Sequence, residues 1–197
     1  FQKNLRGGQE GIIVKMDNQL NSVIWSSYLG GSNDDAIYSL ALDKENNIYV
    51  TGGTISSDFP TTASAYLNTF QDSINPDAFI TQISSDGSKI INSSYYGTNK
   101  YDQSYFVEIS KSNNIYLFGQ TETTGSTLVK NATYFQAGGG QFIAVLSKTL
   151  SSVLRSTVLG TGKGSPDISP TAFLVDVCNK IYLSGWGSNL GGSLSTM

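Results

Sequence analysis

The sequence predicts an all-β protein made of four-stranded antiparallel blades, as in a β-propeller, and three observations favour this class. The motif NIYVTG at residues 47–52 returns as NIYLFG at 114–119 and as KIYLSG at 180–185. The copies start 67 and 66 residues apart, and such near-constant spacing indicates tandem supersecondary units. Apolar residues occupy both faces of the strand expected at 36–43. Sheets packed against neighbours on both faces have this pattern, which favours a propeller over a sandwich.

Each repeat is expected to hold two strand pairs. One kind of pair consists of two apolar runs around a polar turn, at 11–16 with 23–29, 78–83 with 90–96, and 142–146 with 153–159. The other kind ends in the repeated motif, at 36–43 with 48–52, 104–110 with 115–119, and 172–176 with 181–185. The turn of the second copy contains Asp86-Gly87, and glycine provides the positive φ that a tight hairpin needs. Four strands per repeat follow from this parsing.

The predicted blades divide the chain into one propeller domain with a half-blade at each end. The expected limits are 1–31 for the second half of a preceding blade, 32–97 and 98–160 for two complete blades, and 161–197 for the first half of a following blade. This amounts to about three blades, whereas closed propellers have roughly four to eight. We therefore expect the chain to be part of a larger propeller of about seven blades.

Composition excludes several functional classes. The chain is 39% hydrophobic and 14% charged, which is a globular composition, and its net charge of -3 gives no basic surface for nucleic acid. No apolar run reaches the roughly 20 residues of a membrane span, so no membrane insertion is expected. The absence of histidine excludes a Ser-His-Asp or Cys-His nucleophile within this chain. A single cysteine, Cys178, excludes an internal disulfide and is expected to be structural or idle.

Three segments of the first repeat resemble the SBBP family of bacterial β-propeller repeats. They are YLGGSNDDA at 28–36, ALDKENNIYVTG at 41–52 and SDFPTT at 57–62. The segment DVCNKIYLSGWG at 176–187 resembles the variant in large surface proteins of Bacteroidetes, which carry gliding-motility-associated C-terminal domains and leave the cell by type IX secretion. The resemblance implies an exported protein, extracellular or on the outer-membrane surface. The family has no catalytic motif, so the resemblance implies no enzymatic activity.

A candidate ligand site is expected where loops meet at one end of the blades. Asn33, Asp34 and Asp35 precede an inner strand, and Asp58 follows the second strand of the same blade, so the four side chains are predicted to share one face. Clustered carboxylate and carbonyl oxygens suit Ca²⁺ or sugar hydroxyls. The alternative is that these residues form turns through bonds from side chain to main chain. No catalytic residue and no metal ligand set is assigned.

Other polar and aromatic residues also allow two interpretations. Tyr49, Tyr116 and Tyr182 recur in register and are expected in the core between blades, with sugar-stacking platforms as the alternative. The tripeptide Asp72-Ser73-Ile74 matches a short O-glycosylation acceptor pattern of Bacteroidetes and lies in a long polar loop, which makes Ser73 a candidate modification site.

The sequence therefore favours a non-enzymatic propeller scaffold or adhesive binding module, with type IX secretion, gliding or surface adhesion as its setting. A carbohydrate-active enzyme is the alternative, and it would need two carboxylates converging on the axial face, where only Glu108 is expected on an inner strand. A third interpretation treats the chain as structure recognised by the secretion machinery. No cofactor is expected apart from Ca²⁺. The expected partners are the remaining blades, the type IX machinery and surface glycans.

Overall fold

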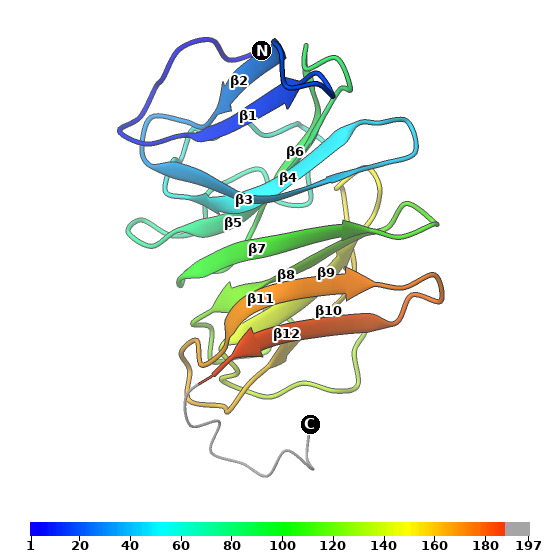
Figure 1. The fold of residues 1–197 in the computed structure, drawn as a ribbon. Helices are drawn as coiled ribbons and strands as arrows, with labels where there is room; N and C mark the ends of the chain where they lie inside the picture. The colour runs from blue at the N-terminus through cyan, green and yellow to red at the C-terminus, as the bar shows by residue number, and fades with distance from the viewer. Residues whose placement is uncertain (188–197) are drawn as a thin grey trace.

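The computed structural model describes residues 1–187, and within that range the protein is all-β with no helix (Figure 1). The strands are β1 (Gly11–Met16), β2 (Val23–Leu29), β3 (Asp35–Leu42), β4 (Ile48–Thr54), β5 (Asp77–Ile83), β6 (Ile90–Tyr96), β7 (Asp102–Ile109), β8 (Ile115–Thr121), β9 (Gln141–Leu146), β10 (Val153–Leu159), β11 (Ser169–Val175) and β12 (Ile181–Trp186). No helix in this range is long and apolar enough to cross a membrane.

The strands form two complete sheets of four, each in sequence order, and two sheets of two. β3 to β6 form one complete sheet and β7 to β10 the other, while β1 pairs with β2 and β11 pairs with β12. All pairings are antiparallel. This arrangement confirms the predicted all-β, blade-forming fold class. Of the half-blade expected at 161–197, residues 188–197 lie outside the described residues.

Each inner hairpin contains the same irregularity, which moves the strand starts relative to the prediction. The pairing register shifts between Ile37 and Ser39 in β3 and between Ser104 and Phe106 in β7. The corresponding shift in β11 lies between Pro170 and Ala172. A bulge of this kind inserts one residue and lets pairing resume beyond it. As a result, all three inner strands begin before the expected residues 36, 104 and 172.

The inner turns also repeat, and each relies on a polar residue that accepts main-chain hydrogen bonds. Asp43 Oδ1 accepts from the N–H groups of Glu45 and Asn47 at 3.0 and 2.8 Å. Asp176 Oδ1 does the same for Cys178 and Lys180, both at 2.8 Å. In each turn an asparagine adopts a positive φ, a conformation that asparagine tolerates better than most residues: Asn46, Asn113 and Asn179, with φ of 60°, 60° and 61°.

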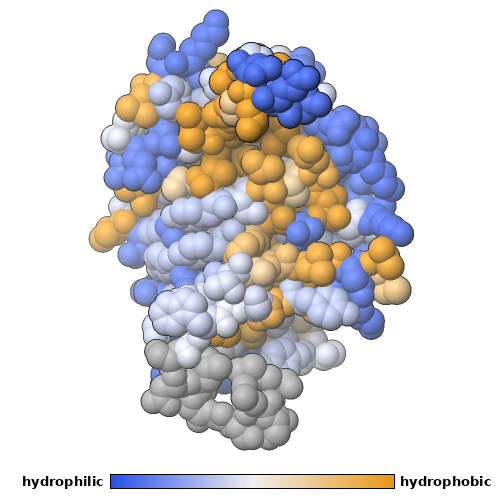
Figure 2. All heavy atoms as spheres, in the orientation of Figure 1, coloured by the Kyte–Doolittle hydropathy of each residue, from blue (hydrophilic) through white to orange (hydrophobic). Residues whose placement is uncertain are grey.

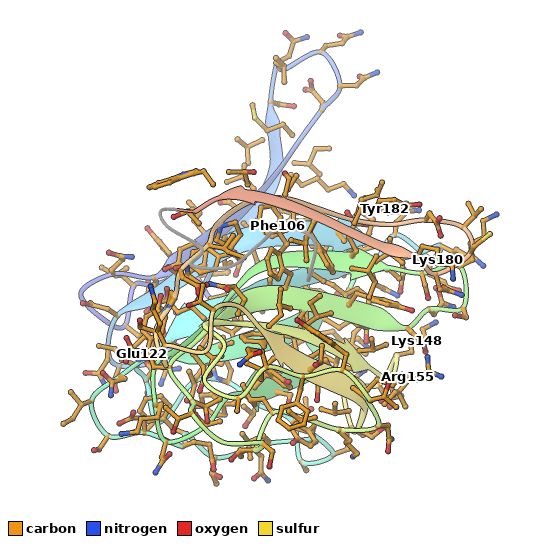
Figure 3. The ribbon with its side chains drawn as sticks, turned by 90° about the horizontal axis from the view of Figure 1, so that it is seen from below. Phe106, Glu122, Lys148, Arg155, Lys180 and Tyr182 are labelled. Carbon is orange, nitrogen blue, oxygen red and sulfur yellow. The ribbon has the colours of Figure 1, made fainter. Side chains whose placement is uncertain are left out.

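The core lies between successive blades. Tyr49 on β4 packs with Val107 and Ile115 of the next blade, and Tyr116 on β8 packs with Phe173 of β11. Tyr49 is fully buried and Tyr116 nearly so, so the core interpretation holds for both tyrosines. Tyr182 differs because it is 55% exposed. Figure 3 shows Tyr182 on the β11–β12 hairpin, with Phe106 between this hairpin and the blade beneath it.

Candidate functional site

The loop that enters β3 and the loop that leaves β4 lie side by side at one end of the first complete blade. The Ile55 N–H donates to the Asp34 carbonyl at 3.1 Å, and the Asn33 N–H donates to Ser56 Oγ at 2.9 Å. In Figure 1 these loops emerge on the left, and the short inner turns lie on the right. The antiparallel strand order requires this arrangement, because an inner strand starts where its partner ends.

Asp35 is the first residue of β3 and is buried. Its Oδ2 accepts hydrogen bonds from the Gly31 N–H at 2.6 Å and from the Ser56 hydroxyl at 3.0 Å. Burial raises the pKa of the carboxyl above its usual value, despite these bonds. The expectation that Glu108 is the acidic residue on an inner strand is thus incomplete, since the bulged strands also include Asp35 and Asp102. Asp35 ties the two loops together from inside.

Asp58 closes the same loops from outside. Its Oδ1 accepts from the Ser32 N–H at 2.7 Å and from the Ser32 hydroxyl at 2.9 Å. Its Oδ2 lies 2.9 Å from Arg6 Nη2 in an exposed ion pair. The hydrogen bond from the Ser32 main chain, with smaller help from the Ser32 side chain and Arg6, holds the pKa of Asp58 below its usual value. Asp58 is therefore charged at neutral pH, and its two oxygens hold the loops together through Ser32 and Arg6.

The residue after Asp58 anchors the loop to the core. The ring of Phe59 is buried, with its centroid 4.4 Å from that of Phe79 and 6.0 Å from that of Tyr95. The Tyr95 hydroxyl donates to the Ser56 carbonyl at 2.7 Å. The segment SDFP, which carries part of the family resemblance, thus acts as a plug that fixes the loop on the blade.

The four predicted site residues do not line one common hollow. Asp34 and Asp35 line a small hollow of about 130 Å³ beside Gln103, and Asn33 lines a separate, larger hollow. Asp58 lines neither of them. Within residues 1–187 no three carboxylate or thiol groups gather closely enough to hold a metal ion. The four residues thus share one end of the blade but do not converge on one point.

The larger hollow is the candidate binding site. It has a volume of about 520 Å³ and is lined mainly by amides and hydroxyls with one aromatic ring: Asn33, Ile55, Ser57, Asn68, Thr69, Phe70, Asp72 and Ser73. Phe70 is half-buried, with its ring centroid 5.9 Å from that of Tyr95. Sequence reasoning missed residues 68–70, and the only available signal was the length of the loop that contains them.

Ser73 lies at the rim of this hollow and is exposed. The preceding Asp72 forms the local turn, because its Oδ1 accepts from the Ile74 N–H and its Oδ2 from the Asn75 amide, both at 2.9 Å. These contacts, chiefly that with the Asn75 side chain, lower the pKa of Asp72. The hydroxyl of Ser73 therefore stands on an ordered and accessible turn, as an acceptor for modification requires.

A pair of buried carboxyls was not anticipated. Asp77 starts β5 and Asp102 starts β7, and both are fully buried. A Cβ placed on Gly97 would lie 2.7 Å from Asp77 Oδ1 and 3.2 Å from Asp102 Oδ2, so the two groups flank this glycine. Burial raises the pKa of each to about 7, and each has one oxygen without a hydrogen-bond partner among the described residues. Because solvent does not reach them, they are not placed to act on a substrate.

Asp86 and Cys178, which the sequence also singled out, both lie in turns between strands. Asp86 accepts from the Ser84 hydroxyl at 2.6 Å and the Ser88 N–H at 3.0 Å, within a turn where Gly87 has a φ of 69°. This is the predicted hairpin turn. Cys178 is an exposed free thiol in the last inner turn.

A comparison with protein-family models finds a match for one segment of the chain. Residues 24–60 match the model of the SBBP β-propeller repeat, and they cover β2 through the Phe59 plug. A search of curated proteins found no match. The four-stranded sheets and this match define a β-propeller scaffold. The repeat at residues 24–60 is of the SBBP type.

Proposed function

We propose that this protein is a non-enzymatic propeller scaffold whose loop-end hollow binds carbohydrate. The observation that supports this proposal best is the 520 Å³ hollow, whose lining combines the polar side chains of Asn33, Asn68 and Thr69 with the aromatic ring of Phe70. Sugars need both kinds of contact, because their hydroxyls exchange hydrogen bonds and their apolar C–H faces pack on aromatic rings. Polar loops held on rigid sheets are also where binding residues collect.

The setting that we propose is the outer surface of a bacterial cell or the medium around it. The support is the resemblance of segments 28–62 and 176–187 to repeats of exported surface proteins, with the family match over 24–60 as a coarser support for the repeat alone. In that setting the partners would be further blades, surface glycans and the type IX secretion machinery, and the role would be gliding or adhesion. Nothing in the described part of the chain favours the alternative of a carbohydrate-active enzyme.

A glycan array probed with the labelled chain tests the proposal. The variant Asn33→Ala/Asn68→Ala removes two amides from the hollow, and we expect at least a tenfold loss of affinity for any glycan that the unaltered chain binds. The matched control is Asn18→Ala/Asn21→Ala, which removes two exposed amides from the β1–β2 turn and should bind as the unaltered chain does.

Two outcomes would contradict the proposal. One is equal binding by the hollow variant and the control, which would place the site elsewhere. The other is the absence of any bound glycan on a broad array. Repeating the binding with Ca²⁺ and with a chelator shows whether the ion contributes. We expect no change, because Asp35 Oδ2 and Asp58 Oδ1 already accept main-chain hydrogen bonds and no three carboxylates gather within residues 1–187.

A further inference from the structure

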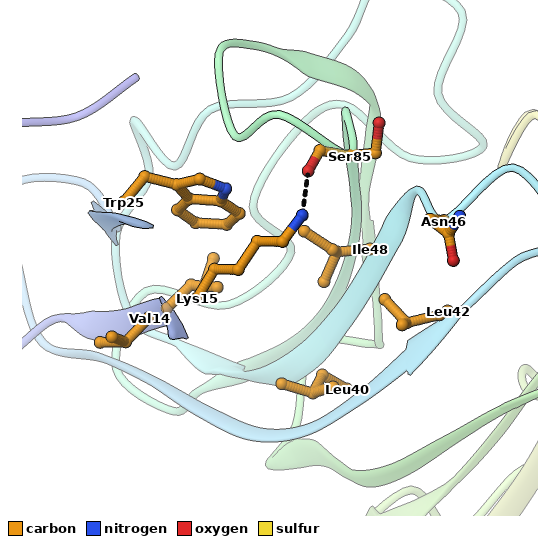
Figure 4. Close-up of a pocket in the computed structure, with 9 residues that line it drawn as sticks. Val14, Lys15, Trp25, Leu40, Leu42, Asn46, Ile48 and Ser85 are labelled. Atoms are coloured by element: carbon orange, nitrogen blue, oxygen red, sulfur yellow. Dashed lines mark hydrogen bonds between the residues drawn. The ribbon is translucent and has the colours of Figure 1, made fainter. Parts of the chain in front are cut away.

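Two hollows of the described chain differ in the chemistry of their lining. One, of about 400 Å³, lies between the β1–β2 hairpin and the first complete blade and is mainly apolar (Figure 4). Figure 2 shows hydrophobic side chains gathered on this face of the molecule, over β1 to β3. Its one charged residue, Lys15, donates a hydrogen bond to the Ser85 carbonyl at 3.2 Å. Such a lining offers little to the hydroxyls of a sugar, whereas the 520 Å³ hollow at the loop end is polar and contains a carboxylate.

The loop-end hollow carries a negative charge that no cation of its lining neutralises. Asp72 is its one charged residue, and no lysine or arginine lines it. Hydrogen bonds, chiefly that from the Asn75 side chain, hold the pKa of Asp72 below its usual value, so the carboxyl is ionised at neutral pH. The two ion pairs within residues 1–187 involve other carboxylates. A ligand that fills the hollow therefore meets a fixed negative charge.

The turn that carries Asp72 is held in place by its own hydrogen bonds. The Gln71 N–H donates to Asp77 Oδ2 at 2.7 Å, and Gln71 Nε2 donates to the Thr69 carbonyl at 2.8 Å. Asp72 Oδ1 accepts from the Ile74 N–H at 2.9 Å. The carboxylate therefore needs little ordering to meet a ligand, and such preorganisation lowers the entropic cost of binding.

Two polar side chains of the lining present acceptors to a ligand. Asn33 Nδ2 donates to the Ile55 carbonyl at 3.3 Å, which leaves Asn33 Oδ1 without a donor among the described residues. Asp72 Oδ2 accepts one hydrogen bond, from Asn75 Nδ2 at 2.9 Å, and a carboxylate oxygen can accept a second. An ammonium group has three donors and no acceptor, so it suits such oxygens. A carboxylate on the ligand would bring only acceptors and a like charge.

The size of the hollow and its aromatic ring fit a sugar rather than a bare cation. Its volume of about 520 Å³ falls within the roughly 300–1,000 Å³ that is typical of small-molecule sites. Phe70 adds an apolar ring, with its centroid 5.9 Å from that of Tyr95, on which the C–H face of a sugar can pack. The ligand class that uses the ring, the amides and the carboxylate together is an amino sugar.

On the basis of the proposed function, we infer that the loop-end hollow selects sugars that carry a free amine, and that Asp72 is the residue that contacts the ammonium group. Sugars with a carboxylate are disfavoured, because they place a like charge beside Asp72. The effect of the charge is modest, since an exposed ion pair changes affinity by at most about fivefold and weakens as salt is added.

A glycan array in three matched forms tests this selectivity. Each oligosaccharide is present with a free amine, in N-acetylated form and as the uronic acid, and its affinity for the 197-residue chain is measured at slightly acidic pH. We expect the free-amine form to bind about two- to fivefold more tightly than the N-acetylated form at low ionic strength, and the uronic acid to bind most weakly. At about 1 M salt, where the screening length is about 3 Å, the preference for the amine should largely disappear.

The variant Asp72→Asn removes the charge and keeps an oxygen for the turn. It should bind the free-amine and N-acetylated forms equally, with its affinity for the N-acetylated form unchanged. The matched control is Asp17→Asn, because Asp17 also forms a turn, accepting from the N–H groups of Gln19 and Asn21 at 3.0 and 2.9 Å, but lies between β1 and β2. The control should keep the preference. The salt dependence of the unaltered chain tests the charge even if Asp72→Asn alters the turn.

Three outcomes would overturn the selectivity and leave the proposed function standing. They are equal binding of the free-amine and N-acetylated forms by the unaltered chain, tighter binding of the uronic acid, and an equal loss of preference in Asp72→Asn and Asp17→Asn. A lysine oligomer that binds as tightly as the amino sugars would show a site for cations in general, which also overturns it. The absence of binding to any glycan in any form would instead contradict the proposed function, and the selectivity with it.

Discussion

The Tyr49 hydroxyl lies 3.3 Å from the main-chain carbonyl oxygen of Lys148 and donates the hydrogen bond that connects two successive blades. The two residues are separated by 99 positions, and the tyrosine ring is fully buried between the sheets. The contact shows how a blade is oriented on its neighbour: apolar packing supplies the area, and a polar group at the end of the ring fixes the position of the outer turn.

The first prediction concerns this bond. Tyr49→Phe should lower the free energy of unfolding by about 0.5–1.5 kcal/mol, the usual net contribution of one hydrogen bond, because the ring stays in place. Urea unfolding followed by fluorescence measures the change. Tyr116→Phe is the control, since its hydroxyl has no comparable bond within residues 1–187 and its loss should cost less. Equal losses in both variants would mean that the bond contributes nothing.

The second prediction concerns packing between the blades. Ile115 is fully buried in the main core cluster, so Ile115→Ala should lower the free energy of unfolding by about 2–5 kcal/mol through lost transfer energy and a cavity. Ile74→Ala is the matched control, because Ile74 is 81% exposed and should change stability by less than about 0.5 kcal/mol. A loss of that small size at Ile115 would show that β8 is peripheral to the folded core.

The third prediction is a pH dependence that arises from Asp77 and Asp102. Burial raises the pKa of both carboxyls to about 7, above the 3.8 expected in an unfolded chain. The folded protein therefore holds protons that the unfolded chain releases, and this stabilisation is complete below about pH 4 and lost as pH rises through about 7. Each group should lower the free energy of unfolding by up to about 1.4 kcal/mol per pH unit in this window.

Asp102→Asn tests this dependence. The amide oxygen can still accept from the Thr98 N–H and hydroxyl, which now donate at 2.6 and 2.8 Å, but it cannot ionise. Urea unfolding between pH 4 and 8 should show a smaller decline for the variant than for the unaltered protein. Asp86→Asn is the control, because hydrogen bonds from Ser84 and Ser88 lower the pKa of Asp86 to about 2 and leave nothing to titrate above pH 4. An unchanged decline in Asp102→Asn would refute the assignment.

The fold was predicted from the repeated motif in the sequence. Ile48, Ile115 and Ile181 are the first residues of β4, β8 and β12, as the spacing of the motif indicated. Strand identity is a local property, because runs of β-branched and aromatic residues bounded by polar turns favour extended backbone wherever they occur. The bulges at the inner strands were not predictable, because they depend on the register with the partner strand.

The candidate site was predicted only in part. Asn33 lies at the loop end of the blade, because the direction of each strand fixes where its loops emerge. Asn68 and Phe70 joined it in one hollow through the fold of a loop that has no periodicity, and no local rule connects residues 35 positions apart.

The residue pattern of this chain determined its strands, their order and the end of the blade at which polar loops gather, since these follow from local propensity and from strand direction. Tertiary packing decided the role of each carboxylate. Asp58 closes a loop because the fold brings Arg6 and Ser32 to it, and Asp102 is buried beside Pro76, Asp77 and Gly97, which come from the preceding blade and its connection to β7. Burial and charge pairing depend on neighbours far away in the chain, and these alone set whether an aspartate is ionised, buried or accessible to a ligand.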